Sequence, residues 1–106
     1  MRLLVVEDDP DLNRQLTTAL TDAGYVVDRA FDGEEGHFLG DSEPYDAVVL
    51  DIGLPKMDGI SVLEAWRRAG RAMPVLIVLV AASVLAGGVD DAPADGKTVV
   101  EVVINA

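Results

Sequence analysis

The sequence predicts an α/β protein in which a doubly wound parallel sheet carries helices on both faces. Short apolar runs alternate along the chain with amphipathic segments of helical periodicity, and the connections between them are short. Hydrophobic residues make up 50% of the chain and charged residues 25%, a balance typical of a packed globule. A chain of 106 residues is enough for one small domain and too short for two, so we expect residues 1–106 to form a single domain.

The first predicted unit is a strand, a turn and a helix. Residues 2–6 form a short apolar run that acidic residues end, as in a central parallel strand buried on both faces. We expect Asp9 to cap the following helix rather than to bind a metal, and Pro10 suits the first turn. Leucine and alanine then repeat at helical spacing until Gly24, where we expect the helix to end.

The second predicted unit is a strand followed by a weaker helix. The strand covers residues 25–30, and Asp32 and Gly33 open the helix. Gly36 and Gly40 lie inside or at the end of this helix, where each costs up to about 1 kcal/mol relative to alanine. The sequence therefore specifies the second helix poorly.

A third unit and a fourth strand follow. Residues 46–51 form an apolar strand that ends on a carboxylate, and Asp58 is expected to cap a third helix. The apolar side of that helix includes Trp66, which we expect in the core, and arginines gather at its carboxyl end, where they favour the helix dipole. Residues 75–80 form the fourth strand, and the apolar run 98–104 is also prone to form a strand.

Acidic residues follow two of the predicted strands, at the edge of the sheet where α/β proteins of this class bind ligands. Glu7 and Asp8 follow the first strand, and Asp51 ends the third. Clustered carboxylates repel one another unless a cation lies among them, and Mg²⁺ prefers oxygen ligands together with a substrate phosphate. A carboxylate can also attack phosphorus, so Asp51 is the candidate nucleophile and the Gly53 carbonyl is a candidate further metal ligand.

Composition argues against several other classes of protein. The formal net charge of −11 opposes contact with phosphate backbones, so we expect no direct binding of nucleic acid. Cysteine is absent, which excludes disulfides and thiolate metal sites and suits a reducing compartment. The amino terminus does not resemble a signal peptide, and the uncharged segment 72–89 contains Pro74 and strand-forming residues. We therefore expect a cytoplasmic protein without a membrane span.

Three motifs carry a resemblance to a known family. They are LLVVEDD at residues 3–9, VVLDIGLPKMDG at residues 48–59 and MPVLIV at residues 73–78. Over about residues 1–78, in order and register, the chain resembles the receiver domains of two-component response regulators, above all those of the OmpR/PhoB-type transcription regulators. The resemblance implies a flavodoxin-like receiver fold.

The resemblance also implies a role in signal transduction by phosphorelay. Asp51 would be the phosphoacceptor, and a sensor histidine kinase would supply the phosphoryl group. Mg²⁺ would be held by Asp8, Asp51 and the Gly53 carbonyl, with Glu7 as the second member of the acidic pair. Lys56 follows the acceptor loop, where it would either meet the phosphate or remain a solvated lysine.

Residues 79–106 depart from the family pattern. The family places a serine or threonine hydroxyl where this chain has Leu79, and a lysine after the fifth strand, whereas Lys97 precedes the apolar run 98–104. The length of the tail leaves no room for the final helix of the family. We therefore expect impaired phosphorylation or switching, and a tail that arose by truncation, frameshift or engineering, with or without removal of a DNA-binding output domain.

Two alternatives belong to other functional classes. A phosphohydrolase of the haloacid-dehalogenase type would need a second aspartate two residues after the nucleophile, and that position is Gly53, so we do not expect an enzyme. A self-association module that keeps the receiver fold without signalling is the stronger rival. Exposed strand edges and the run 98–104 favour a homodimer or a strand-swapped oligomer, with residues 92–96 as a hinge.

Overall fold

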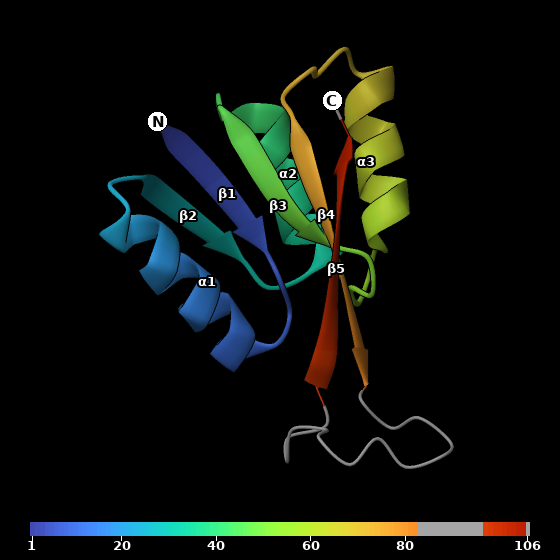
Figure 1. Ribbon diagram of the computed structural model, residues 1–106. Helices are drawn as coiled ribbons and strands as arrows, with labels where there is room; N and C mark the ends of the chain where they lie inside the picture. The colour runs from blue at the N-terminus through green and yellow to red at the C-terminus, as the bar shows by residue number, and fades with distance from the viewer. Residues whose placement is uncertain (83–96, 106) are drawn as a thin grey trace.

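The computed structural model describes the backbone of residues 1–82 and 97–105 and the side chains of residues 1–78. Strands and helices alternate from β1 to β4 (Figure 1), in the order β1 (Arg2–Val6), α1 (Pro10–Asp22), β2 (Val26–Ala30), α2 (Gly33–Ser42), β3 (Ala47–Asp51), α3 (Gly59–Arg68), β4 (Val75–Ala82) and then β5 (Lys97–Asn105). The strands and helices predicted from the sequence match these bounds closely. The predicted hinge at residues 92–96 lies outside the described residues.

The sheet has the strand order β2-β1-β3-β4-β5, and its first four strands run parallel. Val6 pairs with Ala30 on one side and with Leu50 on the other, so β2, β1 and β3 end at the same edge of the sheet. Helix α1 lies on one face, whereas α2 and α3 lie on the other (Figure 1). The predicted doubly wound α/β architecture is therefore confirmed, and the carboxyl edge of β1 and β3 is the place where such folds build a site.

The fifth strand departs from the predicted parallel sheet. The run 98–104 forms a strand as predicted, but β5 is antiparallel to β4, with Val75 opposite Asn105 and Ala81 opposite Val99. An antiparallel neighbour needs no helical crossover, whereas a parallel neighbour needs a connection of roughly a dozen residues or more. The strand thus pairs within its own chain, and its exchange between two chains stays a prediction.

The main hydrophobic core lies between the sheet and helices α2 and α3. Trp66 is fully buried there, as predicted, in one cluster with Leu4 of β1, Val48 of β3 and Val75 of β4. Its indole Nε1 donates a hydrogen bond of 3.2 Å to the carbonyl of His37. This bond joins α3 to α2 and satisfies the polar atom of the buried ring.

Buried glycines bring α2 close to its neighbours. A Cβ on Gly36 would lie 2.7 Å from Cγ1 of Val6 in β1, and a Cβ on Gly40 would overlap the ring of Trp66. A larger residue at either position would therefore push the helix away from the sheet or from α3. The helix that the sequence specifies poorly is set by packing, which offsets the low helix propensity of glycine.

The face of the sheet that carries α1 is less completely covered. An apolar hollow of about 330 Å³ opens there, and its lining includes Leu20 of α1 together with Leu3, Val49 and Leu76 of the sheet. Among the described residues, α1 is the helix on this face, and the family's final helix is not among the helices described there. None of the helices in the described ranges combines the length and the apolar character that crossing a membrane requires.

Candidate functional site

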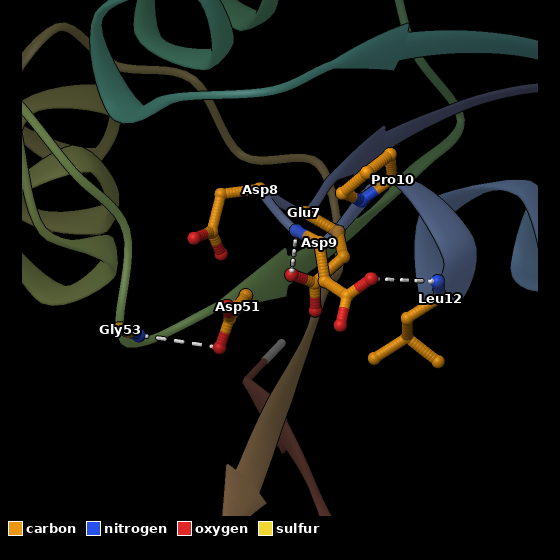
Figure 2. Close-up of a pocket in the computed structure, with 7 residues that line it drawn as sticks. All are labelled: Glu7, Asp8, Asp9, Pro10, Leu12, Asp51 and Gly53. Carbon is orange, nitrogen blue, oxygen red and sulfur yellow. Dashed lines mark hydrogen bonds between the residues drawn. The ribbon is translucent and has the colours of Figure 1, made fainter. Parts of the chain in front are cut away.

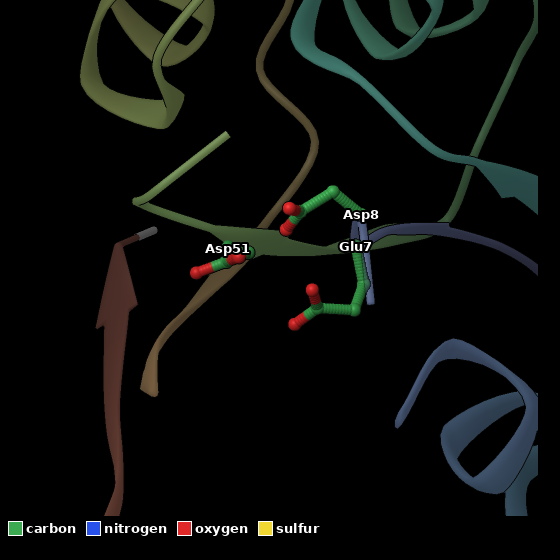
Figure 3. A group of neighbouring side chains, drawn as sticks. All are labelled: Glu7, Asp8 and Asp51. Carbon is green, nitrogen blue, oxygen red and sulfur yellow. The ribbon is translucent and has the colours of Figure 1, made fainter. Parts of the chain in front are cut away.

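Three carboxylates meet at the carboxyl edge of the sheet. Glu7 and Asp8 directly follow β1, and Asp51 is the last residue of β3, the strand that pairs with β1. One carboxylate oxygen from each residue lies within 4.8 Å of the others (Figure 3). The structure therefore brings together the three acidic residues that the sequence predicted as a site, because parallel pairing of β1 and β3 aligns the strand ends.

Two members of this acidic cluster are buried. Glu7 is 3% exposed and Asp51 is 7% exposed, whereas Asp8 is open to solvent. Oε2 of Glu7 accepts a hydrogen bond of 2.9 Å from the backbone N–H of Asp9, and Oδ1 of Asp51 accepts one of 3.2 Å from the N–H of Gly53 (Figure 2). These backbone donors fix one oxygen of each buried carboxylate.

Burial and mutual repulsion make these groups hold protons more tightly. The pKa of Glu7 is raised to about 8, first because burial disfavours the charged form and then because the charges of Asp51 and Asp8 lie nearby. Burial also raises the pKa of Asp51; the Gly53 N–H works against this shift, and the charge of Asp8 adds to it. A cation among the three carboxylates would remove the repulsion and favour their ionised forms.

The carboxylates open into a pocket of about 450 Å³ (Figure 2). Its lining consists of Glu7, Asp8, Asp9, Pro10, Leu12, Asp51 and Gly53 and contains no basic residue within the described part of the chain. An all-oxygen, negatively charged donor set open to water fits a hard divalent cation such as Mg²⁺, which keeps several of its waters. The residues present therefore fit the metal that the sequence predicts.

Two glycines that follow Asp51 in the sequence differ in how closely they are packed. A Cβ on Gly53 would meet no heavy atom within 4 Å, and the φ of Gly53 is not positive. A Cβ on Gly59 at the start of α3, by contrast, would overlap the carbonyl oxygen of Asp51. Gly59 therefore leaves room for the carbonyl of Asp51 at the end of β3, where a side chain would not fit. The role of the Gly53 carbonyl as a metal ligand stays a prediction.

Other residues singled out in the sequence lie around this pocket. Asp9 caps α1 as predicted, because its Oδ1 accepts hydrogen bonds from the N–H groups of Asp11 and Leu12. Lys56 is not among the residues that line the pocket: its Nζ lies 3.6 Å from Oδ2 of Asp32, the N-cap of α2. The side chains at positions 79 and 97, where the sequence departs from the family pattern, lie outside the described residues.

Sequence reasoning missed Asn13, a buried polar residue of α1. Its side chain is fully buried and hydrogen-bonds to the backbone of Glu7. A polar residue on the inward side of an amphipathic helix, four residues after the cap Asp9, was the signal that could have found it.

The fold and the acidic pocket together define a flavodoxin-like α/β domain with a candidate cation site at the carboxyl edge of its sheet. The family model of the response regulator receiver domain matches residues 3–88, which is most of the chain. The chain therefore belongs to the receiver domain family of two-component response regulators.

Individual relatives agree with this assignment. The transcriptional regulatory protein QseB of Haemophilus influenzae is 47% identical over 78 residues, which cover 74% of this chain and 35% of QseB. The transcriptional regulatory protein CusR of Escherichia coli K12 is 41% identical over 78 residues, or 34% of its length. The aligned length of 78 residues agrees with the length predicted for the resemblance, and the family model continues to residue 88. The chain spans about a third of the length of these relatives.

Solved structures of receiver domains share the fold. The receiver domain of the Francisella response regulator 1452 superimposes with a TM-score of 0.72 at 31% identity, covering 81% of this chain and 69% of that chain. The response regulator TrrA from Thermotoga maritima, solved in complex with Mg²⁺-BeF, gives a TM-score of 0.67 at 35% identity, covering 70% and 64%.

Proposed function

We propose that this receiver domain accepts a phosphoryl group on Asp51 and that Mg²⁺ assists the transfer. The observation that carries the proposal is the convergence of Glu7, Asp8 and Asp51, with one oxygen of each within 4.8 Å of the others, at the edge of the sheet. Asp8, Asp51 and the Gly53 carbonyl would hold the ion, with Glu7 as the second acidic residue. The complex of the relative TrrA with Mg²⁺-BeF supports this choice of cation.

The proposed phosphoryl donor is a phosphohistidine of a sensor histidine kinase. A carboxylate oxygen of Asp51 attacks phosphorus, the phosphorus–nitrogen bond breaks, and its electron pair leaves with the imidazole nitrogen, which takes up a proton. Mg²⁺, when bound by these residues, would neutralise negative charge on the transferring group. The N–H of Gly53 holds the other carboxylate oxygen of Asp51, so one oxygen is left to react.

Asp51 must be ionised to act as a nucleophile, and the acids around it work against that. Burial raises its pKa, and the nearby charge of Asp8 raises it further. A bound cation reverses this effect, so metal binding and activation of the nucleophile are linked. The pocket would therefore be reactive only when loaded with metal.

The transfer is expected to be impaired because two donors of the family pattern are missing from the sequence. Position 79 is a leucine without a hydroxyl, and Lys97 precedes the last apolar run instead of following it. A hydrogen bond to a charged group contributes roughly 1.5–3 kcal/mol, so the acyl phosphate would be poorly stabilised. Control of transcription, the role in the names of the relatives QseB and CusR, is part of the same proposal.

Phosphorylation can be tested by incubating the chain with acetyl phosphate and Mg²⁺ and measuring intact mass. We expect one phosphoryl adduct that forms slowly, is abolished in Asp51→Asn, and persists in Asp58→Asn, an exposed acid that caps α3. Leu79→Thr is expected to raise the ratio of phosphorylated to unphosphorylated chain by about tenfold or more, because one recovered hydrogen bond to a charged group contributes roughly 1.5–3 kcal/mol. An adduct that survives in Asp51→Asn would refute the assignment of the acceptor.

A further inference from the structure

Asn13 is the one buried polar side chain that the proposed chemistry does not use. Among the described side chains, the buried polar or charged ones are those of Glu7, Asn13 and Asp51, and Asn13 is 0% exposed. It lies in the first turns of α1, directly beneath the loop that carries Glu7 and Asp8. Burying an amide costs free energy unless hydrogen bonds satisfy it, so its partners define what the residue does.

All of the hydrogen-bonding capacity of Asn13 is used. Its Nδ2 donates to the carbonyl oxygens of Glu7 at 3.0 Å and Ala30 at 3.1 Å. Its Oδ1 accepts from Nε of Arg29 at 2.6 Å and from Oγ1 of Thr17 at 3.2 Å. Two carbonyls accept from its nitrogen and two donors face its oxygen, so the orientation of the amide is fixed. A flip would place the amide oxygen against two carbonyl oxygens.

The bond to Glu7 acts on the peptide group that links Glu7 to Asp8. The N–H of Glu7 donates to the carbonyl of Ala30 at 3.0 Å, and Asn13 holds the carbonyl of Glu7 and that of Ala30 together. Both ends of Glu7 are thus tied to the end of β2. The directions of the Glu7 and Asp8 side chains follow from this peptide orientation, since each Cα–Cβ bond is fixed relative to its backbone.

We propose that Asn13 is a positioning residue that holds Glu7 and Asp8 in the geometry needed to bind a divalent cation with Asp51; this rests on the proposed metal site. Without the amide, the buried carbonyls of Glu7 and Ala30 lose a donor, and the loop rotates to reach water. Groups in the outer shell of metal sites typically contribute 10–100-fold in affinity. Asn13 acts through the backbone, so we expect a loss near the lower end, about tenfold.

The test is calorimetric titration of the full chain with Mg²⁺. Asn13→Leu keeps the branched shape of the side chain without its hydrogen-bonding groups, and Asn13→Ala serves if leucine is too bulky. Both variants are expected to bind Mg²⁺ about tenfold more weakly than the wild type. Thr17→Val removes a donor to the same amide oxygen and leaves both carbonyls paired, so its affinity should be unchanged. Leu63→Ala lowers stability in the core of α3, away from the loop, and should also bind normally.

A second measurement separates this proposal from the proposed function. Amide hydrogen exchange at Asp9, whose N–H donates to Glu7, should be faster in Asn13→Leu and unchanged in Thr17→Val. Equal Mg²⁺ affinity in the wild type and Asp51→Asn would refute the metal site, yet the exchange rates would still report on the loop. Wild-type Mg²⁺ affinity and wild-type exchange in Asn13→Leu and Asn13→Ala, with affinity lost in Asp51→Asn, would refute the positioning role alone.

Discussion

Glu7 is the acid of the site whose proton matters most to the stability of the metal-free fold. Its folded-state pKa of about 8 lies far above the ordinary value of 4.5, because the carboxyl is buried beside Asp51 and Asp8. The folded protein therefore binds a proton that the unfolded chain has already released between these two pH values. Stability from this group is fully present below about pH 4.5 and is lost as the pH rises through about 8.

The free energy of unfolding should therefore depend on pH when Mg²⁺ is removed with a chelator. Urea denaturation is expected to show stability falling between about pH 5 and pH 8, and a large part of the fall should disappear in Glu7→Gln, which cannot ionise. Glu64→Gln changes an exposed acid of α3 and should keep the wild-type profile. Saturating Mg²⁺ should restore stability at the higher pH. A profile that is the same in the wild type and Glu7→Gln would contradict the raised pKa.

Glycine at position 40 is required by packing against Trp66. A Cβ there would overlap the indole ring, which is fully buried and hydrogen-bonded to the same helix. Gly40→Ala should therefore lower the free energy of unfolding by about 1–3 kcal/mol, despite the higher helix propensity of alanine, and should shift the Trp66 fluorescence. Gly53→Ala, where a Cβ meets no atom within 4 Å, is the matched control and should leave stability nearly unchanged. A more stable Gly40→Ala would show that the ring has room to move.

At the scale of elements, local signals predicted the helix starts and the strand ends. Asp9, Asp32 and Asp58 each cap a helix through hydrogen bonds to backbone N–H groups within three residues, so the information lies in the adjacent sequence. The positions of Glu7, Asp8 and Asp51 followed from the same reasoning, because a strand that ends in an acid places it at the sheet edge.

The features that the sequence did not predict depend on distant contacts. The packing role of Gly40 depends on the Trp66 ring on another helix, and the clearance at Gly59 depends on the Asp51 carbonyl. The direction of β5 is not set by its own sequence, because its nearly continuous apolar run suits a parallel or an antiparallel neighbour. The bonds of Asn13 to Glu7 and Ala30 likewise join segments that only the folded sheet brings together.

At the scale of the whole molecule, open apolar surface favours self-association, whereas net charge opposes it. Strands β2 and β5 are the two edges of the sheet, and the hollow of about 330 Å³ beside α1 leaves apolar side chains partly exposed. Exposed strand edges and apolar surface favour association with a second copy. The formal net charge of −11 opposes it, because two such chains repel each other at low ionic strength.

We predict a dimer or larger oligomer joined through the region after residue 79, either by exchange of β5 or by pairing along its open edge. Light scattering at micromolar concentration should give at least twice the mass of one chain. The dimer fraction should rise with salt, because screening weakens the repulsion between the acidic chains.

Deletion of residues 97–106 distinguishes an oligomer that depends on β5 from a monomer that does not need this strand. The deletion removes β5 from its pairing with β4 and leaves Val75, Leu76, Ile77 and Val78 at a new sheet edge, so we expect aggregation or unfolding. Slow exchange of labelled subunits would favour strand exchange, since β5 must leave its partner before it can cross to another chain, whereas edge pairing would exchange quickly. A stable monomer in both the full chain and the deletion variant, at all salt concentrations, would show that β5 neither completes the core nor forms an interface.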